Sequence, residues 1–398
     1  MNQVLDFLQK TEEFRIFGEA LSKKGSSVIW KEASEEIAWT AIQEAWRTTT
    51  ASLVVVTPNL YKAQLLYDRL SASMPEDALA FFPQDEFITS EMLVSSHEFK
   101  MERINTIRDI LEGKRQVVIT HTAGLLKPQM PRERWKKAVL ELIAGHDYEM
   151  DRLAKTLVEY GFKREYTVEK PGDFSVRGGI LDLFPLNASE PYRLDFFGDT
   201  LETVKAFDIE TQRSIRAVIS IRVFPMYEFF YDDKELDTLI HIIDEKIQNG
   251  DFSPAALAKI QKDRDSLSAH EELDRLGRYI PFLTGHESTL LNLMEEKSLF
   301  FVDFTRVLDQ YELMKREIAD WYLSTNDYAR MGFTMLQNLD GLKADHWVCF
   351  DYLDHQYPVD FDFTIRMHHR EPARYEGDFS LLRKDLTGYL RRTTVLLA

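Results

Sequence analysis

The chain has 398 residues, of which 44% are hydrophobic and 29% are charged, and its formal net charge is −17. This length and composition predict a globular protein of two or three domains, and they argue against broad nucleic-acid binding, because affinity for a duplex depends on lysine and arginine. A single cysteine, Cys349, excludes internal disulfides and cysteine-rich metal sites. The sequence has no apolar stretch of about 18 residues and no signal-peptide pattern. We therefore expect a cytoplasmic location and no membrane contact.

The first third of the chain alternates between strand and helix patterns. Short apolar runs typical of buried strands occur at 26–30, 52–58, 79–83 and 116–121, and amphipathic helical patterns separate them. Strands that alternate with helices predict a parallel sheet that is covered by helices on both faces.

After residue 137 the pattern changes to closely spaced strands. A helical pattern at 151–162 precedes strand-like segments at 164–169, 173–184, 191–197 and 200–208, which Gly, Pro and Asn residues separate. This spacing predicts antiparallel hairpins. From about residue 225 the chain becomes helical again, and the run at 298–304 resembles the strands of the first third. The order indicates a small domain inserted into a larger one.

We therefore predict an α/β fold with three parts. Residues 1–136 and 225–350 are assigned to a split parallel-sheet domain, and residues 137–224 to an inserted α+β domain with an antiparallel sheet. Residues 351–398 are assigned to an acidic, proline-interrupted linker and the start of a further C-terminal domain. In that last part, an amphipathic helix is predicted over 379–392, and the apolar end "TTVLLA" is predicted to begin a buried strand of a truncated domain.

Motifs for nucleotide and metal chemistry are absent from the sequence. A phosphate loop needs the pattern G-x-x-x-x-G-K-[ST], whereas the segment after the first predicted strand reads "WKEASEE" (30–36) and contains no glycine. Asp303 ends a later strand and could hold Mg²⁺, but Phe304 follows it where a catalytic Glu is expected, so a structural role is favoured. We predict no catalytic residue, no metal site and no cofactor in this chain.

Two stretches with basic residues allow more than one interpretation. The segment "KPQMPRERWKK" (127–137) has five cations, which favours a basic linker over a patch that faces DNA or a partner. Arg177 lies before Gly178 and Gly179, between two apolar runs. Taken alone, this pattern is typical of a surface charge, with the glycines shaping the strand, for example through a bulge.

A family resemblance comes from three adjoining motifs. The runs "RGGILDLFP" (177–185), "PYRLDFFGD" (191–199) and "FDIETQRS" (207–214) closely resemble the signature of the bacterial transcription-repair coupling factors. They are more distantly similar to the repair helicase subunit UvrB. Weaker similarity extends over roughly residues 15 to 325, most of the chain.

The resemblance implies a degenerate, helicase-like α/β domain that has lost its phosphate loop, with an inserted domain that binds the repair ATPase UvrA. The positions that contact UvrA in the family match Arg177, Arg193 and Phe197. Since strand side chains alternate with period two, Arg193 and Phe197 are expected on one face. The alternatives are a cross-strand salt bridge from Arg193 to Asp195 or Glu202, and core packing of Phe197 with Phe196 exposed.

The function that the resemblance implies is a binding module. It is the N-terminal part of a coupling factor, has no ATPase activity of its own, and binds UvrA to recruit nucleotide excision repair to stalled RNA polymerase. ATP, Mg²⁺, RNA polymerase and DNA would be bound by further domains of a parent protein that is an ATP-dependent DNA translocase. Two alternatives remain: a UvrB-like nucleotide-dependent helicase half, and an autoinhibitory module whose surface is masked by a C-terminal domain of the parent.

Overall fold

The structure is a computed structural model of the whole chain. It describes residues 7–8, 10–84, 97–186, 188–269, 279, 282–283, 288–332, 336–357, 359–366 and 378–390. The end "TTVLLA", which was predicted to begin a strand, lies outside the described residues.

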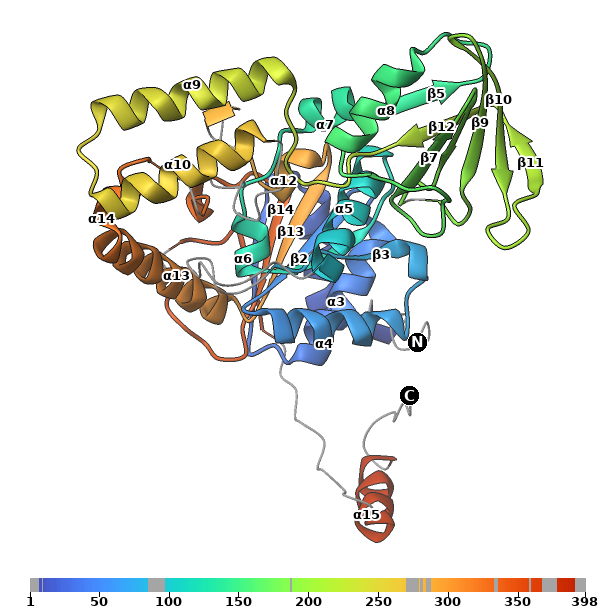
Figure 1. The fold of residues 1–398 in the computed structure, drawn as a ribbon. Helices are drawn as coiled ribbons and strands as arrows, with labels where there is room; N and C mark the ends of the chain where they lie inside the picture. Colours follow the sequence, from blue (N-terminus) through green and yellow to red (C-terminus); the bar gives the residue numbers. More distant parts are fainter. Residues whose placement is uncertain are drawn as a thin grey trace.

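A parallel sheet of seven strands forms the centre of the larger domain, in the order β15-β1-β14-β13-β2-β4-β3 (Figure 1). All neighbouring strands in it run parallel. Its strands are β1 (Ser27–Lys31), β2 (Ser52–Thr57), β3 (Leu79–Phe81), β4 (Val117–His121), β13 (Lys297–Val302), β14 (His346–Phe350) and β15 (Phe363–Arg366). The two halves of the chain therefore build one sheet, which confirms the predicted split α/β fold.

The sheet is buried on both faces because its strands are apolar at successive positions. In β2, Val54 and Val56 point into one hydrophobic core and Leu53 and Val55 into the other. Helices α2, α3 and α4 cover the second face, whereas α5, α6, α7, α9, α10, α12 and α13 contribute to the first core. Burial on both faces is what a parallel sheet requires.

Local sequence explains where several helices begin. The side chain of Asn59 accepts a hydrogen bond from the backbone N–H of Lys62 at the start of α4, and Asp232 and Glu235 form a capping box at the start of α9. The helices of the larger domain are α2 (Glu12–Ser22), α3 (Glu35–Thr48), α4 (Leu60–Ser71), α5 (His97–Leu111), α6 (Thr122–Leu126), α7 (Arg132–Ala138), α9 (Asp233–Asn249), α10 (Pro254–Ser268), α12 (Leu290–Leu293), α13 (Phe304–Ser324) and α14 (Asn326–Ala329). A last helix, α15 (Phe379–Leu390), lies within the range predicted for it.

The inserted region contains a six-stranded sheet in the order β11-β10-β9-β8-β7-β6, a two-stranded antiparallel ribbon, and helix α8 (Figure 1). The six-stranded sheet is antiparallel except for the β6–β7 pair. Its elements are β5 (Leu140–Ile143), α8 (Met150–Glu159), β6 (Lys163–Arg164), β7 (Asp173–Arg177), β8 (Ile180–Leu183), β9 (Tyr192–Phe197), β10 (Thr200–Phe207), β11 (Ser214–Val218) and β12 (Ser220–Val223). An antiparallel α+β insert is therefore confirmed.

One face of this sheet packs on α8 and the ribbon. Leu153 and Leu157 of α8 join a core with side chains such as Phe174, Leu194 and Phe196 from the sheet. Among the described residues of the insert no second layer of helices covers the opposite face; a small cluster of Val168, Phe184 and Phe207 is buried there, whereas Arg177 and Phe197 reach solvent.

Two predictions about the ends of these regions are wrong. The strand expected at 164–169 is limited to β6, because Glu169 and Lys170 donate their backbone N–H groups to the Asp173 side chain instead of to a neighbouring strand. The linker assigned from residue 351 onward is interrupted by β15, which pairs in parallel with β1. The domain boundaries themselves stay a prediction.

The basic segment 127–137 is not a linker. Residues 132–138 form α7, and Trp135 is fully buried against Phe230. Four of the five cations are paired with carboxylates: Lys127 with Glu228, Arg132 with Glu295, Arg134 with Glu235, and Lys136 with Glu133. This neutralisation also removes the main reason to expect a DNA-facing patch here.

Candidate partner-binding surface

The solvent-facing side of the six-stranded sheet holds all three residues that the sequence singled out. In β9, Leu194 and Phe196 are buried in the core of the insert, so Arg193, Asp195 and Phe197 point to the opposite face. Arg193 and Phe197 thus share one face, as the alternation predicts. We call this side of β7, β8, β9 and β10 the outer face.

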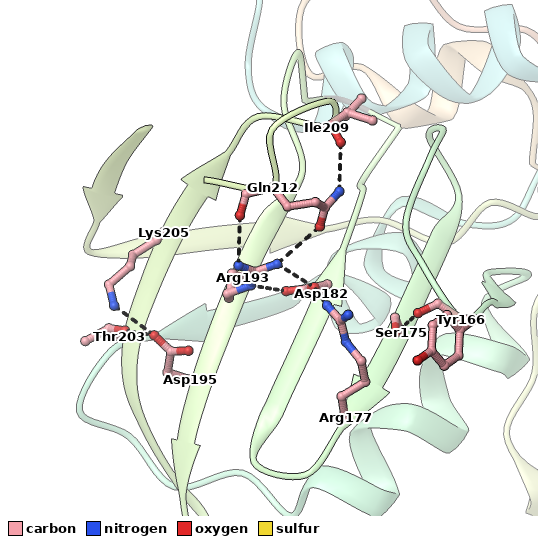
Figure 2. A network of polar contacts seen from close by, with 10 residues as sticks. All are labelled: Tyr166, Ser175, Arg177, Asp182, Arg193, Asp195, Thr203, Lys205, Ile209 and Gln212. Atoms are coloured by element: carbon pink, nitrogen blue, oxygen red, sulfur yellow. Dashed lines mark hydrogen bonds and ion pairs between the residues drawn. The ribbon is translucent and has the colours of Figure 1, made fainter. Parts of the chain in front are cut away.

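Arg177 and Arg193 meet at one carboxylate on the outer face (Figure 2). The register places Asp182 of β8 directly opposite Arg193 of β9. Arg193 donates from Nε to Oδ1 of Asp182 at 2.7 Å and from Nη2 to Oδ2 at 2.9 Å, while Arg177 donates from Nη2 to Oδ2 at 2.7 Å. Two arginines from different strands are therefore joined through a single acidic side chain.

The two arginines differ in how much of their surface is free. Arg193 also donates to the carbonyl and the side-chain oxygen of Gln212, and its guanidinium lies 4.6 Å from the ring centroid of Phe207. Its side chain is 19% exposed, whereas that of Arg177 is 42% exposed. Hydrogen bonding to Asp182, opposed by partial burial, raises the pKa of Arg193, so this cation stays charged.

The alternative salt bridge of Arg193 was expected at Asp195 or Glu202, and the structure corrects the partner to Asp182. Asp195 instead accepts hydrogen bonds from Thr203 at 2.6 Å and Lys205 at 2.9 Å (Figure 2). Burial raises the pKa of Asp195, but these two hydrogen bonds outweigh burial and the pKa lies below its ordinary value. Asp195 is therefore hydrogen-bonded to side chains of β10 and not to Arg193.

Phe197 is exposed and Phe196 is buried. The side chain of Phe197 is 77% exposed, and that of Phe196 is 9% exposed within the core of the insert. The alternative in which Phe197 packs in the core and Phe196 faces solvent is therefore wrong. Exposure of such a large aromatic ring is the feature that partner surfaces often share, because Phe and Tyr supply much of the apolar contact area at interfaces.

Gly178 and Gly179 form a two-residue turn between β7 and β8, and not a bulge. Gly178 has a φ of 60°, which a residue with a side chain rarely adopts. A Cβ at Gly179 would lie 2.7 Å from the backbone oxygen of Phe196. The turn thus packs against the end of β9, and it places Arg177 at the same end of the sheet as Phe197.

Asp182 was not recognised as part of the site. The sequence "GGILDLF" contains a signal for it, since a single carboxylate between Leu181 and Leu183 must face away from the core that these leucines enter. Which cations it meets depends on the pairing of β7, β8 and β9, and pairing between strands is not visible in the pattern of one strand.

The edge of the parallel sheet where a nucleotide would bind is acidic. A cavity of about 280 Å³ lies at the carboxyl ends of β1, β13 and β14, and Glu35, Asp303 and Asp351 are among its lining residues. Burial and the nearby Asp351 raise the pKa of Asp303. Asp351 is held by hydrogen bonds from the backbone and hydroxyl of Thr305. Arg306 also lines the cavity, but the three carboxylates outnumber it and oppose the binding of phosphate.

Two features are absent from the described residues. Nowhere in the described ranges do three or more His, Cys, Asp or Glu side chains gather in a way that could hold a metal ion. Among the helices of the same residues, none has the length and apolar character needed to cross a membrane.

The fold is a helicase-like α/β domain, split by an inserted domain with an antiparallel sheet. The family model described as "UvrB interaction domain" matches residues 140–229, which include the six-stranded sheet and the ribbon.

The chain is similar over much or all of its length to bacterial transcription-repair-coupling factors. It is 29% identical to that of Bacillus subtilis over 281 residues, which cover 69% of this chain and 24% of the relative. It is 22% identical to a relative from Staphylococcus epidermidis over all of this chain and 35% of the relative, and 25% identical to one from Staphylococcus aureus over 89% and 31%. The predicted resemblance is confirmed, and the chain spans about a quarter to a third of the length of these relatives.

Proposed function

We propose that this chain is a binding module that docks UvrA through the outer face of its inserted domain. The observation that carries the proposal is the combination of Arg177, Arg193 and the exposed ring of Phe197 on one face of a UvrB interaction domain. Arginine forks pair with carboxylates, and an exposed aromatic ring fills an apolar pocket, so the two types together dominate interface hot spots. Recruitment of UvrA by a coupling factor would bring nucleotide excision repair to a stalled RNA polymerase.

The relatives are longer than this chain, and we assign the other activities to the parts of them that this chain does not match. We propose that contacts with RNA polymerase and DNA, together with ATP- and Mg²⁺-dependent translocation, belong to further domains of a longer parent protein. The chain itself is proposed to bind no nucleotide. The absence of a phosphate loop after β1 and the acidic cavity around Asp303 support this assignment. The competing helicase hypothesis requires ATP binding by the chain, which titration calorimetry with ATP and Mg²⁺ would detect.

A titration of the chain with UvrA tests the binding proposal. Arg177→Ala, Arg193→Ala and Phe197→Ala are each expected to weaken the affinity by about 30-fold, the effect of truncating an interface hot spot. Arg216→Ala is the matched arginine control, because Arg216 lies on β11 of the same sheet, is half exposed and pairs with Glu190. Tyr61→Ala, an exposed aromatic on α4, is the control for Phe197.

Both controls are expected to keep the affinity of the wild type. If the three outer-face variants also bind UvrA within about twofold of the wild type, the surface has been assigned to the wrong residues.

A further inference from the structure

Asp182 is almost completely buried although it lies on the solvent-facing side of a sheet. Its side chain is 2% exposed, and the guanidinium groups of Arg177 and Arg193 both donate hydrogen bonds to it. We propose that Asp182 is a positioning residue for UvrA binding: it holds Arg177 in the orientation in which the free edge of its guanidinium faces the partner. This inference rests on the proposed function.

In the cluster of Arg177, Asp182 and Arg193, the side chains of Arg193 and Asp182 are held in place. Arg193 uses Nε and Nη2 on the two oxygens of Asp182 and Nη1 on the carbonyl of Gln212, and it packs against the ring of Phe207. A bidentate arginine–carboxylate pair is geometrically specific, because two parallel hydrogen bonds fix both planes. The Asp182 carboxylate is therefore held in place before Arg177 contacts it.

Arg177 is the member of this cluster whose side chain can still bind a partner. Among the described residues, Asp182 is the acceptor that the Arg177 side chain reaches, through Nη2 alone. The Nε and Nη1 donors and the second N–H of Nη2 are left for a partner, and the side chain is 42% exposed. An arginine that is already held by one hydrogen bond loses less rotamer freedom on binding than an arginine with no such bond. The group that fits its open edge is a carboxylate, since that pairing is planar and charge-assisted.

The charges support the same division of roles. Two cations and one anion give this cluster a net charge of +1, so the pair of Asp182 and Arg193 is neutral and the uncompensated charge belongs to Arg177. Removing the Asp182 charge would leave two guanidinium groups facing an uncharged residue. Repulsion would then separate the two cations, and Arg177 would populate several rotamers.

Asp182→Asn tests this role because it keeps the size of the side chain and removes the charge. We expect UvrA affinity to fall about tenfold, mainly through lost preorganisation of Arg177. In an Arg177→Ala background the same substitution is expected to change the affinity by less than about twofold, since Arg177 is no longer present to be positioned and Arg193 is still held by Gln212 and Phe207. Glu190→Gln is the matched control, because Glu190 also pairs with an arginine, Arg216 of β11, and neither residue is assigned to UvrA binding. It is expected to bind UvrA as the wild type does.

Thermal unfolding of each variant separates positioning from loss of fold. If Asp182→Asn does not fold, Asp182→Glu replaces it in the same cycle, with a smaller expected loss because the charge is kept. The inference is overturned if the substitution weakens binding equally in both backgrounds, which is the result of a structural role. Unchanged or tighter binding by the single variant also overturns it. Normal binding by Arg177→Ala overturns the inference as well, whereas the proposed function fails only if Arg193→Ala and Phe197→Ala also bind normally.

Discussion

The parallel sheet and the antiparallel sheet of this chain use their two faces differently. The parallel sheet packs helices on both faces, so Phe300 and Phe301, which point in opposite directions, are both fully buried. The antiparallel sheet has its core on one face and exposes Arg177 and Phe197 on the other. Side chains that could recognise a partner therefore gather on the sheet with a free face, whereas the polar groups of the parallel sheet are enclosed and support the fold.

The largest expected effect is on the free energy of unfolding, which two phenylalanine substitutions should change to very different extents. Phe301→Ala removes a buried ring from the centre of β13, where it contacts Phe304 and Trp347, and is expected to lower the free energy of unfolding by about 3 to 5 kcal/mol. Phe197→Ala is expected to change it by less than about 0.5 kcal/mol, because the ring is exposed. Urea unfolding measures both.

Binding should show the reverse order for the same two variants. At a temperature where it remains folded, Phe301→Ala is expected to bind UvrA normally, while Phe197→Ala binds weakly. Weak binding by a folded Phe301→Ala protein would contradict the separation between the two sheets.

A smaller effect concerns a titratable group enclosed in the parallel sheet. His121 ends β4, and its pKa is lowered to about 4, because burial and the charge of Arg103 outweigh the hydrogen bond with the Gln84 backbone, which raises it. In the unfolded chain the pKa is near 6.5, so between these values the unfolded state binds a proton that the folded state does not. Stability is therefore expected to fall as the pH is lowered from 7 to 4.5, by on the order of 2 to 3 kcal/mol from this residue.

His121→Asn isolates this contribution, because asparagine does not titrate. Urea unfolding at pH 7 and pH 4.5 should give a smaller loss for the variant than for the wild type. Equal losses would mean that His121 is as easily protonated in the folded chain as in the unfolded one.

The smallest expected effect tests the junction between the two regions. Glu228, on the segment that leaves the insert, accepts hydrogen bonds from Arg103 of α5 and from Lys127. Glu228→Gln leaves these two largely buried cations with a neutral partner, which is expected to lower the free energy of unfolding by about 2 kcal/mol at pH 7. Glu133→Gln, which changes an exposed carboxylate in an i,i+3 pair, is the control.

The pH dependence of this junction has a defined direction. Burial alone would raise the pKa of Glu228, but Arg103 and Lys127 outweigh it and the pKa lies well below 4.5. The ionised form thus contributes stability above pH 4.5, and that contribution is lost as the pH falls through the pKa of the folded state. The difference between wild type and Glu228→Gln should shrink in acid. A difference that grows toward pH 3 would contradict the ion cluster.

Much of the fold could be predicted because its signals are local. Apolar runs at 52–58 and 116–121, separated by helical periodicity, are enough to indicate a buried parallel sheet. The ribbon strands β5 and β12 were missed because each is four residues long and they pair across the whole insert. The strand β15 was missed because it follows a stretch that is rich in Asp and interrupted by one Pro, and only its pairing with β1 makes it part of the sheet.

The sequence by itself determined the α/β fold with its insert, the absence of a phosphate loop, and the alternation that places Arg193 and Phe197 on one face. These properties depend on neighbouring residues and on a period of two, so they can be read along one strand. Only the tertiary structure decided which face is open, because α8 packs on one side of the sheet. It also decided that Arg177 and Arg193 share Asp182, because that contact depends on the register of three strands, and register is set by packing between segments and not within any one of them.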